Sequence, residues 1–238
     1  MRGLFITGTD TGVGKTYVGA LIARALCAAG YRVGVYKPVA SACRCQSGQV
    51  VSDDALRLWE AAGRRGACQR VCPQRFLAPL APHLAARQEG KQLDAALLRS
   101  GLEYWRACSD VILVEGAGGL MSPLGDDEYV ADLALDFGFP LIVVARNALG
   151  TINHTLQTLV VAGTFRGGLA TAGIVLNHLG PPGEDPSTAT NRQQIAARCT
   201  PPILAEVAWQ AERFDVDVDW YGLANTTARP AVALSQRR

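Results

Sequence analysis

Short apolar runs rich in Val, Ile and Leu recur along this 238-residue chain, and stretches with helical spacing separate them. None of the runs alternates apolar with polar residues, which is typical of strands buried on both faces of a sheet. Strands that alternate with helices form βαβ units. The sequence therefore predicts an α/β fold, a three-layer sandwich with a mostly parallel central sheet. The expected strands are Gly3–Thr7, Arg32–Tyr36, Val111–Glu115, Leu141–Ala145, Gly173–Leu176 and a weaker sixth, Ile203–Val207.

The stretches between the strands predict the helical layers. From Val18 to Ala29, apolar residues recur every three or four positions and form one helix face, which Gly30 ends. Further helices are expected at Asp53–Ala62, Leu93–Ala107, Tyr129–Phe137, Asn153–Thr164 and Ser187–Arg198.

The chain is expected to be one domain, residues 1–238, because a core of this size needs no disulfide bonds. Residues from about 40 to 90 differ from the rest, since Gly, Pro, Arg and Cys cluster there and only one helix, that at Asp53, is convincing. We interpret this stretch as an insertion that builds a site. The tail, about residues 211–238, is expected to be irregular, and its last six residues, ALSQRR, to fray.

The composition argues against several kinds of partner. Apolar residues make up 49% of the chain and charged residues 18%, as in an ordered globular protein. The net charge is only +2, from 23 basic and 21 acidic residues, so we expect neither nucleic acid nor a membrane as partner. The apolar runs are strand-sized and the N-terminus lacks the layout of a signal peptide, which predicts a cytoplasmic location.

Cysteine and lysine usage narrows the candidate sites. Seven cysteines are present, but their close pairs lack a second pair at zinc-site spacing. We expect reduced, structural thiols, with a metal or redox role as the alternative. Only three of the 23 basic residues are lysines, namely Lys15, Lys37 and Lys91. A lysine ammonium binds phosphate as a compact point charge, so each of the three is a candidate ligand.

The segment GTDTGVGKT, residues 8–16, leaves the first predicted strand and enters the first predicted helix. Its glycines let successive N–H groups and the helix N-terminus surround a polyphosphate. Lys15 would reach the β and γ phosphates, and Thr16 would offer its hydroxyl to Mg²⁺. Thr9 stands where the usual pattern has its first glycine, with Gly8 one residue earlier. The segment predicts a phosphate-binding loop and a P-loop NTPase-like fold, with a plain glycine-rich turn as the alternative.

Two more segments deliver charged residues to the carboxyl edge of the predicted sheet, where open α/β sheets bind ligands. Glu115 ends a buried strand in VILVEGAGG, and Mg²⁺ binds one or two carboxylates plus phosphate oxygens, so Glu115 is a natural partner for Thr16. Lys37, in YKPVAS, is expected near the phosphate loop and outside the core. Ser41 could bind a polar substrate group. A solvated glutamate and a surface lysine are the alternative interpretations.

Asp53 and Asp54 open the helix within the insertion. They either complement the helix dipole or supply a further Mg²⁺ ligand. His83, His154 and His178 are isolated in the sequence, and they are interpreted as structural or adjacent to the substrate.

Taken together, these segments resemble the dethiobiotin synthetase family. The matching motifs run in family order over residues 3–210: GTDTGVGKT, YKPVAS, SDDAL, PHLAA, EGAGGLMSPL, GTINHTL and LNHLGPPG. The resemblance also accounts for the longer phosphate loop, which is a family feature.

The resemblance implies an ATP-dependent cyclo-ligase of biotin biosynthesis that forms carbon–nitrogen bonds. In that family 7,8-diaminononanoate takes up CO₂ as a carbamate, ATP phosphorylates the carbamate, and the second amine displaces phosphate. The products are dethiobiotin, ADP and phosphate. Such a transfer needs charge neutralisation and alignment more than proton transfer, and Lys15, Lys37 and Mg²⁺ would supply the positive charge.

Site residues are implied by the same resemblance. Lys15 and Lys37 would be catalytic, and Asp54 is preferred to Asp53 as a metal ligand because Ala55-Leu56 follow it. The implied Mg²⁺ ligands are Thr16, Asp54 and Glu115. The implied nucleotide contacts are Gly12, Val13, Gly14, Lys15, Thr16, Tyr17, Asp54, Glu115, Gly116, Ala117, Gly118, Asn177, His178, Ala208, Trp209 and Gln210. The implied substrate contacts are Thr11 and Ser41, with Thr151, Ile152 and Asn153 of a second subunit in a homodimer, where they would bind the distal carboxylate.

The chain departs from the family at three places, one of which is an insertion containing Cys43 to Gly48 that makes Asp54 over Asp53 an alignment choice. Gly12 stands where many members have glutamate, and Ala208 stands where a proline often precedes the tryptophan of the purine-binding loop. Two other classes share the loop. A ligase of the cobyrinic acid diamide synthase type would need a large additional domain. A positioning ATPase of the ParA or MinD type usually carries an earlier loop lysine, which this loop lacks.

Overall fold

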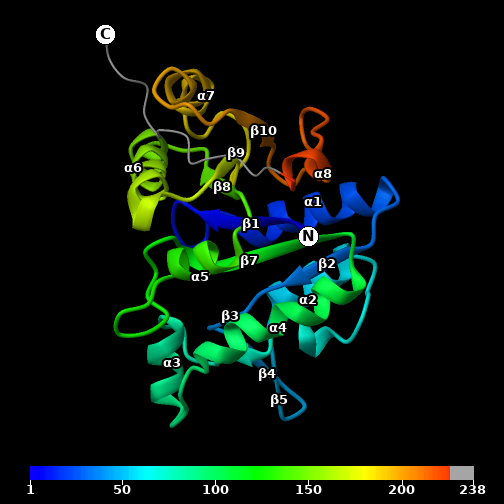
Figure 1. Ribbon diagram of the computed structural model, residues 1–238. Helices are drawn as coiled ribbons and strands as arrows, with labels where there is room; N and C mark the ends of the chain where they lie inside the picture. Colours follow the sequence, from blue (N-terminus) through cyan, green and yellow to red (C-terminus); the bar gives the residue numbers. More distant parts are fainter. Residues whose placement is uncertain (226–238) are drawn as a thin grey trace.

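The computed structural model describes residues 1–225, and its centre is a sheet of six strands (Figure 1). The order across the sheet is β10-β9-β8-β1-β7-β2, and every neighbouring pair is parallel. The strands are β1 (Arg2–Gly8), β2 (Val33–Tyr36), β7 (Val111–Gly119), β8 (Leu141–Arg146), β9 (Thr171–Asn177) and β10 (Ile203–Val207). All six predicted strands are confirmed, although β7 continues past Glu115 to Gly119.

Helices cover both faces of this sheet, as two adjacent residues of β1 show. Phe5 packs its ring against Phe137 in α5 (Val130–Phe137), with 6.4 Å between ring centroids. Ile6 points the other way and lies against Gly19 in α1 (Lys15–Ala28), where an added Cβ would come within 3.1 Å of it. Successive side chains of a strand face opposite sides. The predicted three-layer α/β sandwich is therefore confirmed.

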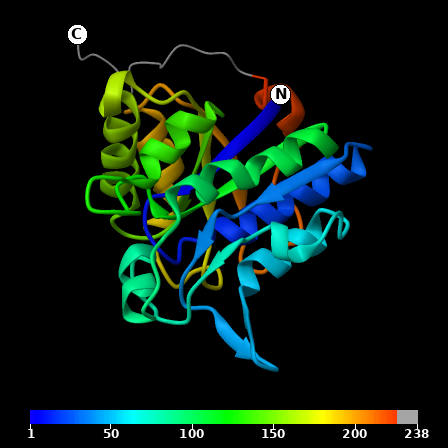
Figure 2. The ribbon, with the colours of Figure 1, turned by 60° about the horizontal axis from the view of Figure 1, so that its bottom comes forward.

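Four more long helices extend the two outer layers (Figure 2). Helix α2 (Asp53–Ala61) packs on α1, and α4 (Ala95–Cys108) packs on β2 and α5. Helix α6 (Thr151–Thr164) packs on β8, and α7 (Thr188–Ala196) packs on α6. Two short 3-10 turns are η1 (Cys68–Arg70) and η2 (Phe165–Gly167). Side-chain caps fix two starts: Ser52 accepts from Ala55 N and Asp94 from Leu97 N. Within residues 1–225, no helix combines the length and apolarity needed to cross a bilayer.

The chain reverses its direction of travel across the sheet at β1. From β1 it passes to β2 and returns to β7, which lies between them, and it then continues on the other side of β1 through β8, β9 and β10. Ligands bind at such a switch point, beyond the carboxyl ends of the strands. The segment that follows β1, residues 8–16, lies at this point.

Residues 40–90 are more ordered than the sequence indicated. Besides α2 they form α3 (Pro82–Gln88) and two small sheets, one pairing β3 (Val39–Ala40) with β6 (Gln74–Arg75), the other pairing β4 (Arg44–Gln46) with β5 (Gln49–Val51). The expectation of a single helix here is wrong. Pro82 stands in the first turn of α3, where proline needs no hydrogen-bond partner for its nitrogen, so its presence favours a helix start.

The C-terminal stretch also departs from expectation. A short helix, α8 (Trp220–Leu223), interrupts the tail that was expected to be irregular, because Asp219 accepts a hydrogen bond from Gly222 N and caps it. Trp220 is buried against Phe214. The ALSQRR ending, for which fraying is expected, lies outside the described residues.

Candidate active site

The phosphate-loop segment adopts a conformation that depends on its glycines. Gly14 caps the start of α1 with a φ of 92°, and Gly12 has a φ of 76°, both in the left-handed region that favours glycine. A Cβ on Gly14 would lie 2.1 Å from Nδ2 of Asn177. That amide donates a hydrogen bond to Val13 O at 2.9 Å, so the end of β9 is bonded directly to the phosphate loop. Backbone N–H groups at the start of α1 remain free to bind an anion.

Lys15 lies inside this loop. Its residue is 7% exposed and its Nζ donates to Asp10 O at 3.1 Å, which folds the ammonium back over the loop. Burial lowers the pKa of Lys15, and the charge of Glu115 opposes that effect only in part. A buried cation with a single neutral hydrogen-bond partner is available to a phosphate group.

Glu115 and Lys37 meet beside the loop. Glu115 Oε1 accepts from Lys37 Nζ at 2.5 Å and from Thr16 Oγ1 at 2.8 Å. Lys37 is 4% exposed and Glu115 1% exposed, so both charges are buried. Burial by itself would lower the pKa of Lys37, but the carboxylates of Glu115 and Asp54 outweigh it and hold that pKa above its ordinary value. The two carboxylates therefore favour the charged form of Lys37.

The expectation that Lys37 lies outside the core is wrong. The insertion covers it: Lys37 N donates to Val71 O at 2.7 Å, and β3 and β6 pair just beyond. A residue that follows a strand is exposed only when nothing folds over the strand end, and here residues 40–90 do so.

Asp54 and Asp53 have separate surroundings. Asp54 Oδ2 lies 2.8 Å from Lys37 Nζ. Burial opposes ionisation of Asp54, yet Lys37, Thr16 and Lys15 together lower its pKa. Asp53 instead pairs with Arg44, at 2.6 Å, on the exposed hairpin. Asp54 therefore belongs to the cluster at the phosphate loop, and Asp53 does not.

The donors in this cluster suit Mg²⁺. Glu115 Oε2 is buried and has no hydrogen-bond partner among the described residues, so one carboxylate oxygen is unused. Thr16 and Asp54 add a hydroxyl and a second carboxylate. Within residues 1–225, no three histidine, cysteine or acidic side chains are grouped so that they could hold a metal ion by themselves. A set of one or two carboxylates plus phosphate and water is what Mg²⁺ prefers.

The glycine segment after Glu115 borders the phosphate loop. Gly116, Ala117 and Gly118 continue β7, and Gly118 has a φ of 71°. A Cβ on Gly118 would lie 2.1 Å from Ser122 Oγ and 3.6 Å from Thr11 Oγ1, which places this segment beside the loop. Ser122 Oγ accepts from Gly119 N at 2.9 Å. By contrast, Ser41 is half-buried just after β3, with no hydrogen bond to the cluster.

The ends of β9 and β10 form a third part of the site. Asn177 is 1% exposed, and Nε2 of the next residue, His178, lies 3.1 Å from Glu206 Oε2. Trp209 is 43% exposed in the turn after β10, with Ala208 and Gln210 beside it. Tyr17, in the first turn of α1, donates its hydroxyl to Ala211 O at 2.5 Å. Tyr17 therefore ties this turn to the phosphate-loop helix.

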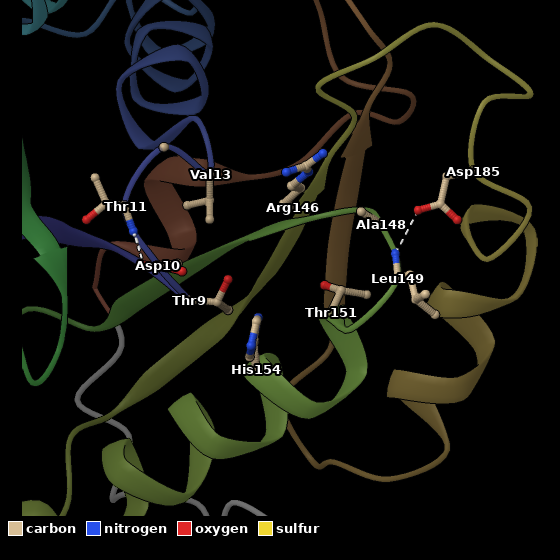
Figure 3. A pocket seen from close by; sticks show the side chains of 11 residues that line it. Thr9, Asp10, Thr11, Val13, Arg146, Ala148, Leu149, Thr151, His154 and Asp185 are labelled. Atoms are coloured by element: carbon tan, nitrogen blue, oxygen red, sulfur yellow. Dashed lines mark hydrogen bonds between the residues drawn. The ribbon is translucent and has the colours of Figure 1, made fainter.

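A cavity of about 370 Å³ borders the phosphate loop (Figure 3). Thr9 to Val13 line one wall, and Arg146, Ala148, Leu149, Thr151, His154 and Asp185 line the other. Thr151 begins α6, and Ile152 and Asn153 complete its first turn. Oγ1 of Thr151 is buried and without a hydrogen-bond partner among the described residues. The cluster around Lys37 does not line this cavity, so the predicted site residues form two separate groups.

Relatives with assigned activities cover most of the chain. The "ATP-dependent dethiobiotin synthetase BioD" of Anaeromyxobacter dehalogenans (strain 2CP-1) is 46% identical over 214 residues, which are 89% of this chain and 92% of that protein. The protein of the same name from Rhodopirellula baltica is 43% identical, over 85% and 82%, and the BioD 1 protein of Escherichia coli K12 is 36% identical, over 87% and 91%. This chain belongs to the dethiobiotin synthetase family.

The wider comparisons place this dethiobiotin synthetase family member among P-loop proteins. A family profile described as "AAA domain" matches residues 2–213. The MinD structure from Aquifex aeolicus, in complex with MinC, aligns with a TM-score of 0.52 and 16% identity, over 89% of this chain and 83% of that one. The ParA family ATPase of Chlorobium tepidum gives 0.51 and 17%, over 88% and 84%. At these identities the likeness shows the fold alone.

Two polar residues of this family member were missed in the sequence analysis. Ser122 lies within the EGAGGLMSPL motif but was not singled out. Arg146 directly follows the predicted strand that ends at Ala145. The strand-end rule that pointed to Glu115 and Lys37 applies equally to Arg146 and would have found it.

Proposed function

We propose that this protein is a dethiobiotin synthetase. It would use Mg²⁺ and ATP to close the ureido ring of dethiobiotin from 7,8-diaminononanoate and CO₂, releasing ADP and phosphate. The observation that supports this best is the buried contact of Lys37 with Glu115 beside the phosphate loop, at 2.5 Å. It sets a cation, a carboxylate and an anion-binding backbone within one small volume.

The phosphate loop would hold ATP through its backbone. The N–H groups of Gly12, Val13 and Gly14 and the N-terminus of α1 would bind the phosphates, with Lys15 moving from Asp10 O to the β and γ phosphates. Thr16, Asp54 and Glu115 would hold Mg²⁺, which when bound neutralises charge on the phosphates. The orphaned Oε2 of Glu115 supports this role.

Lys37 would act on the group being transferred. A carbamate oxygen attacks the γ-phosphoryl group, ADP leaves, and the second amine then attacks the carbamate carbon and displaces phosphate. Each partner in the first step is an anion, so a fixed positive charge between them lowers the barrier. The ammonium of Lys37 carries that charge, because its carboxylate neighbours hold its pKa above the ordinary value.

The purine end would lie beyond Asn177. Asn177 and His178, together with the turn at Ala208, Trp209 and Gln210, would contact the base, and Tyr17 would fix that turn through its bond to Ala211 O. Gly116, Ala117 and Gly118 would border the phosphates and the substrate amines.

The diaminononanoate would reach across two subunits. Thr11 and Ser41 would hold the amine end near Lys37, and the first turn of α6 in the second subunit, Thr151 to Asn153, would bind the carboxylate end. The protein would therefore act as a cytoplasmic homodimer whose partners are small molecules and not nucleic acid or membranes.

The decisive experiment is ADP release by the purified protein with and without diaminononanoate and bicarbonate, with dethiobiotin identified by mass. We expect release to require both compounds and to match dethiobiotin formation one for one. ADP release that ignores both would instead indicate a positioning ATPase of the ParA or MinD kind and would reject the proposal.

A further inference from the structure

The cavity beside the phosphate loop contains a cation that no other part of the described structure uses. Arg146 lies at the end of β8 and lines this cavity with Thr151 and His154 (Figure 3). Its guanidinium makes no hydrogen bond and no ion pair within residues 1–225, and the residue is exposed. By contrast, Arg192 in α7 has carboxylate partners in Glu206 and Asp215. Arg146 is thus free to bind an anionic ligand.

The acidic residues of the same cavity are already engaged. Asp185 Oδ2 accepts from Leu149 N at 2.7 Å and its Oδ1 accepts from Ser187 N at 2.9 Å. The side chain of Ser187, these two backbone hydrogen bonds and, to a smaller degree, the charge of Arg146 lower the pKa of Asp185. Asp10 Oδ1 accepts from Thr11 N at 2.6 Å. Both carboxylates therefore hydrogen bond backbone N–H groups of loops next to the cavity, and the N–H donors of Arg146 stay available for a ligand.

A second observation indicates that the missing partner is an anion. Oγ1 of Thr151 is buried, and it has no hydrogen-bond partner among the described residues. Thr151 begins α6, a helix of 14 residues whose N-cap, Gly150, has no side chain to satisfy the first N–H groups. An unpaired hydroxyl, a helix N-terminus and a free guanidinium thus meet around one cavity. A carboxylate suits all three, because it accepts several hydrogen bonds and pairs with the planar fork of arginine.

We propose that Arg146 is a specificity-determining residue, whose guanidinium pairs with the carboxylate of diaminononanoate and selects the acid over diamines that lack it. This inference rests on the proposed function. It adds a charged residue to the carboxylate site that the first turn of α6 would form. Hydrogen bonds alone would discriminate less between the acid and a diamine that lacks the carboxylate. It also assigns Arg146 no part in phosphate transfer: Gly12 and Val13 of the phosphate loop line its cavity, but Lys15, Thr16 and Glu115 do not.

The test compares two substrates in three variants. Diaminononanoate is compared with 2,3-diaminononane, in which a methyl group replaces the carboxylate. In Arg146→Gln we expect the KM for the acid to rise by about tenfold to hundredfold, the range for a lost charge-assisted hydrogen bond. The kcat, the KM for ATP and kcat/KM for the diamine should stay unchanged. Arg146→Lys should recover part of the loss, since it restores the charge without the fork.

Arg24→Gln is the matched control. Arg24 is exposed on α1, in a groove lined also by Glu212, Phe214 and Asp217, and its substitution removes the same charge elsewhere. It should leave both substrates unaffected. An unchanged KM for the acid in Arg146→Gln would overturn the inference. So would an equal loss with the diamine, or a matching rise in the KM for ATP, which would assign Arg146 to the phosphates. If the native protein closes no ring at all, the proposed function fails, and that result is distinct from these.

Discussion

Lys37 and Glu115, 78 residues apart in the chain, form a buried ion pair with 2.5 Å between Nζ and Oε1. They meet because β2 and β7 are neighbours in the sheet, with Tyr36 in register with Val114. Lys37 follows Tyr36 and Glu115 follows Val114, so the two charged side chains lie next to each other. A buried charge without its partner destabilises a protein strongly, so each of these two side chains is stable in its buried, charged form only when the other is present.

Lys37→Gln should abolish ring closure and also destabilise the protein. It leaves Glu115 buried without its cation, which we expect to lower the free energy of unfolding by about 3 kcal/mol. Denaturant titration and dethiobiotin formation measure the two effects. The double variant Lys37→Gln, Glu115→Gln should regain part of the stability and none of the activity. A purely additive loss of stability would show that the two residues are not coupled.

The Lys37–Asp54 ion pair predicts how stability depends on pH. The pKa of Asp54 is lowered on folding and that of Lys37 is raised. The contribution of Asp54 is therefore complete above its ordinary pKa of 3.8 and is lost as the pH falls through the lower, folded value. That of Lys37 is complete below 10.5 and is lost only as the pH rises through its folded value.

The corresponding variant is Asp54→Asn, with Asp53→Asn as its control. The difference in unfolding free energy between the native protein and Asp54→Asn should be constant from pH 5 to 9, and should shrink toward acid pH. For Asp53, whose partner is an exposed arginine, a smaller difference is expected. A difference that grew as the pH fell below 4 would contradict the assignment of Asp54 to the cluster.

The hydroxyl of Tyr17 is expected to set the affinity for ATP. Tyr17→Phe removes only the bond to Ala211 O and should raise the KM for ATP by about fivefold, the value of one net hydrogen bond near 1 kcal/mol. The KM for diaminononanoate should not change. Tyr31→Phe is the control, since Tyr31 stacks on Tyr221 away from this turn. Equal effects of the two variants would remove Tyr17 from the nucleotide site.

A site shared between subunits predicts complementation. Asn153→Asp places a negative charge at the proposed carboxylate site and should raise the KM for diaminononanoate strongly, whereas Lys37→Gln should be inactive. Refolded together, the two variants should regain activity with a native KM, because mixed dimers hold one site with an intact Lys37 and an intact Asn153. If both residues acted within one subunit, the mixture would keep the high KM of Asn153→Asp.

The sequence by itself determined the sheet, the phosphate loop and the family. Buried runs such as Leu141 to Ala145 specify strands locally. Gly12 and Gly14 allow the left-handed backbone conformation that the phosphate loop requires. These signals are local, so they can be read from neighbouring residues. Motif order then pointed to the dethiobiotin synthetase family, which the relatives confirm.

Only the tertiary structure decided which charged groups share an environment. It buried Lys37, which the sequence placed outside the core, because residues 40–90 fold over the end of β2. It separated Asp54 from Asp53, because one faces Lys37 and the other Arg44. It also brought Arg146 and Thr151 to the lining of one cavity. Each of these depends on strand order and on contacts between distant segments, and pairwise electrostatics at a few ångströms cannot be read from spacing along the chain.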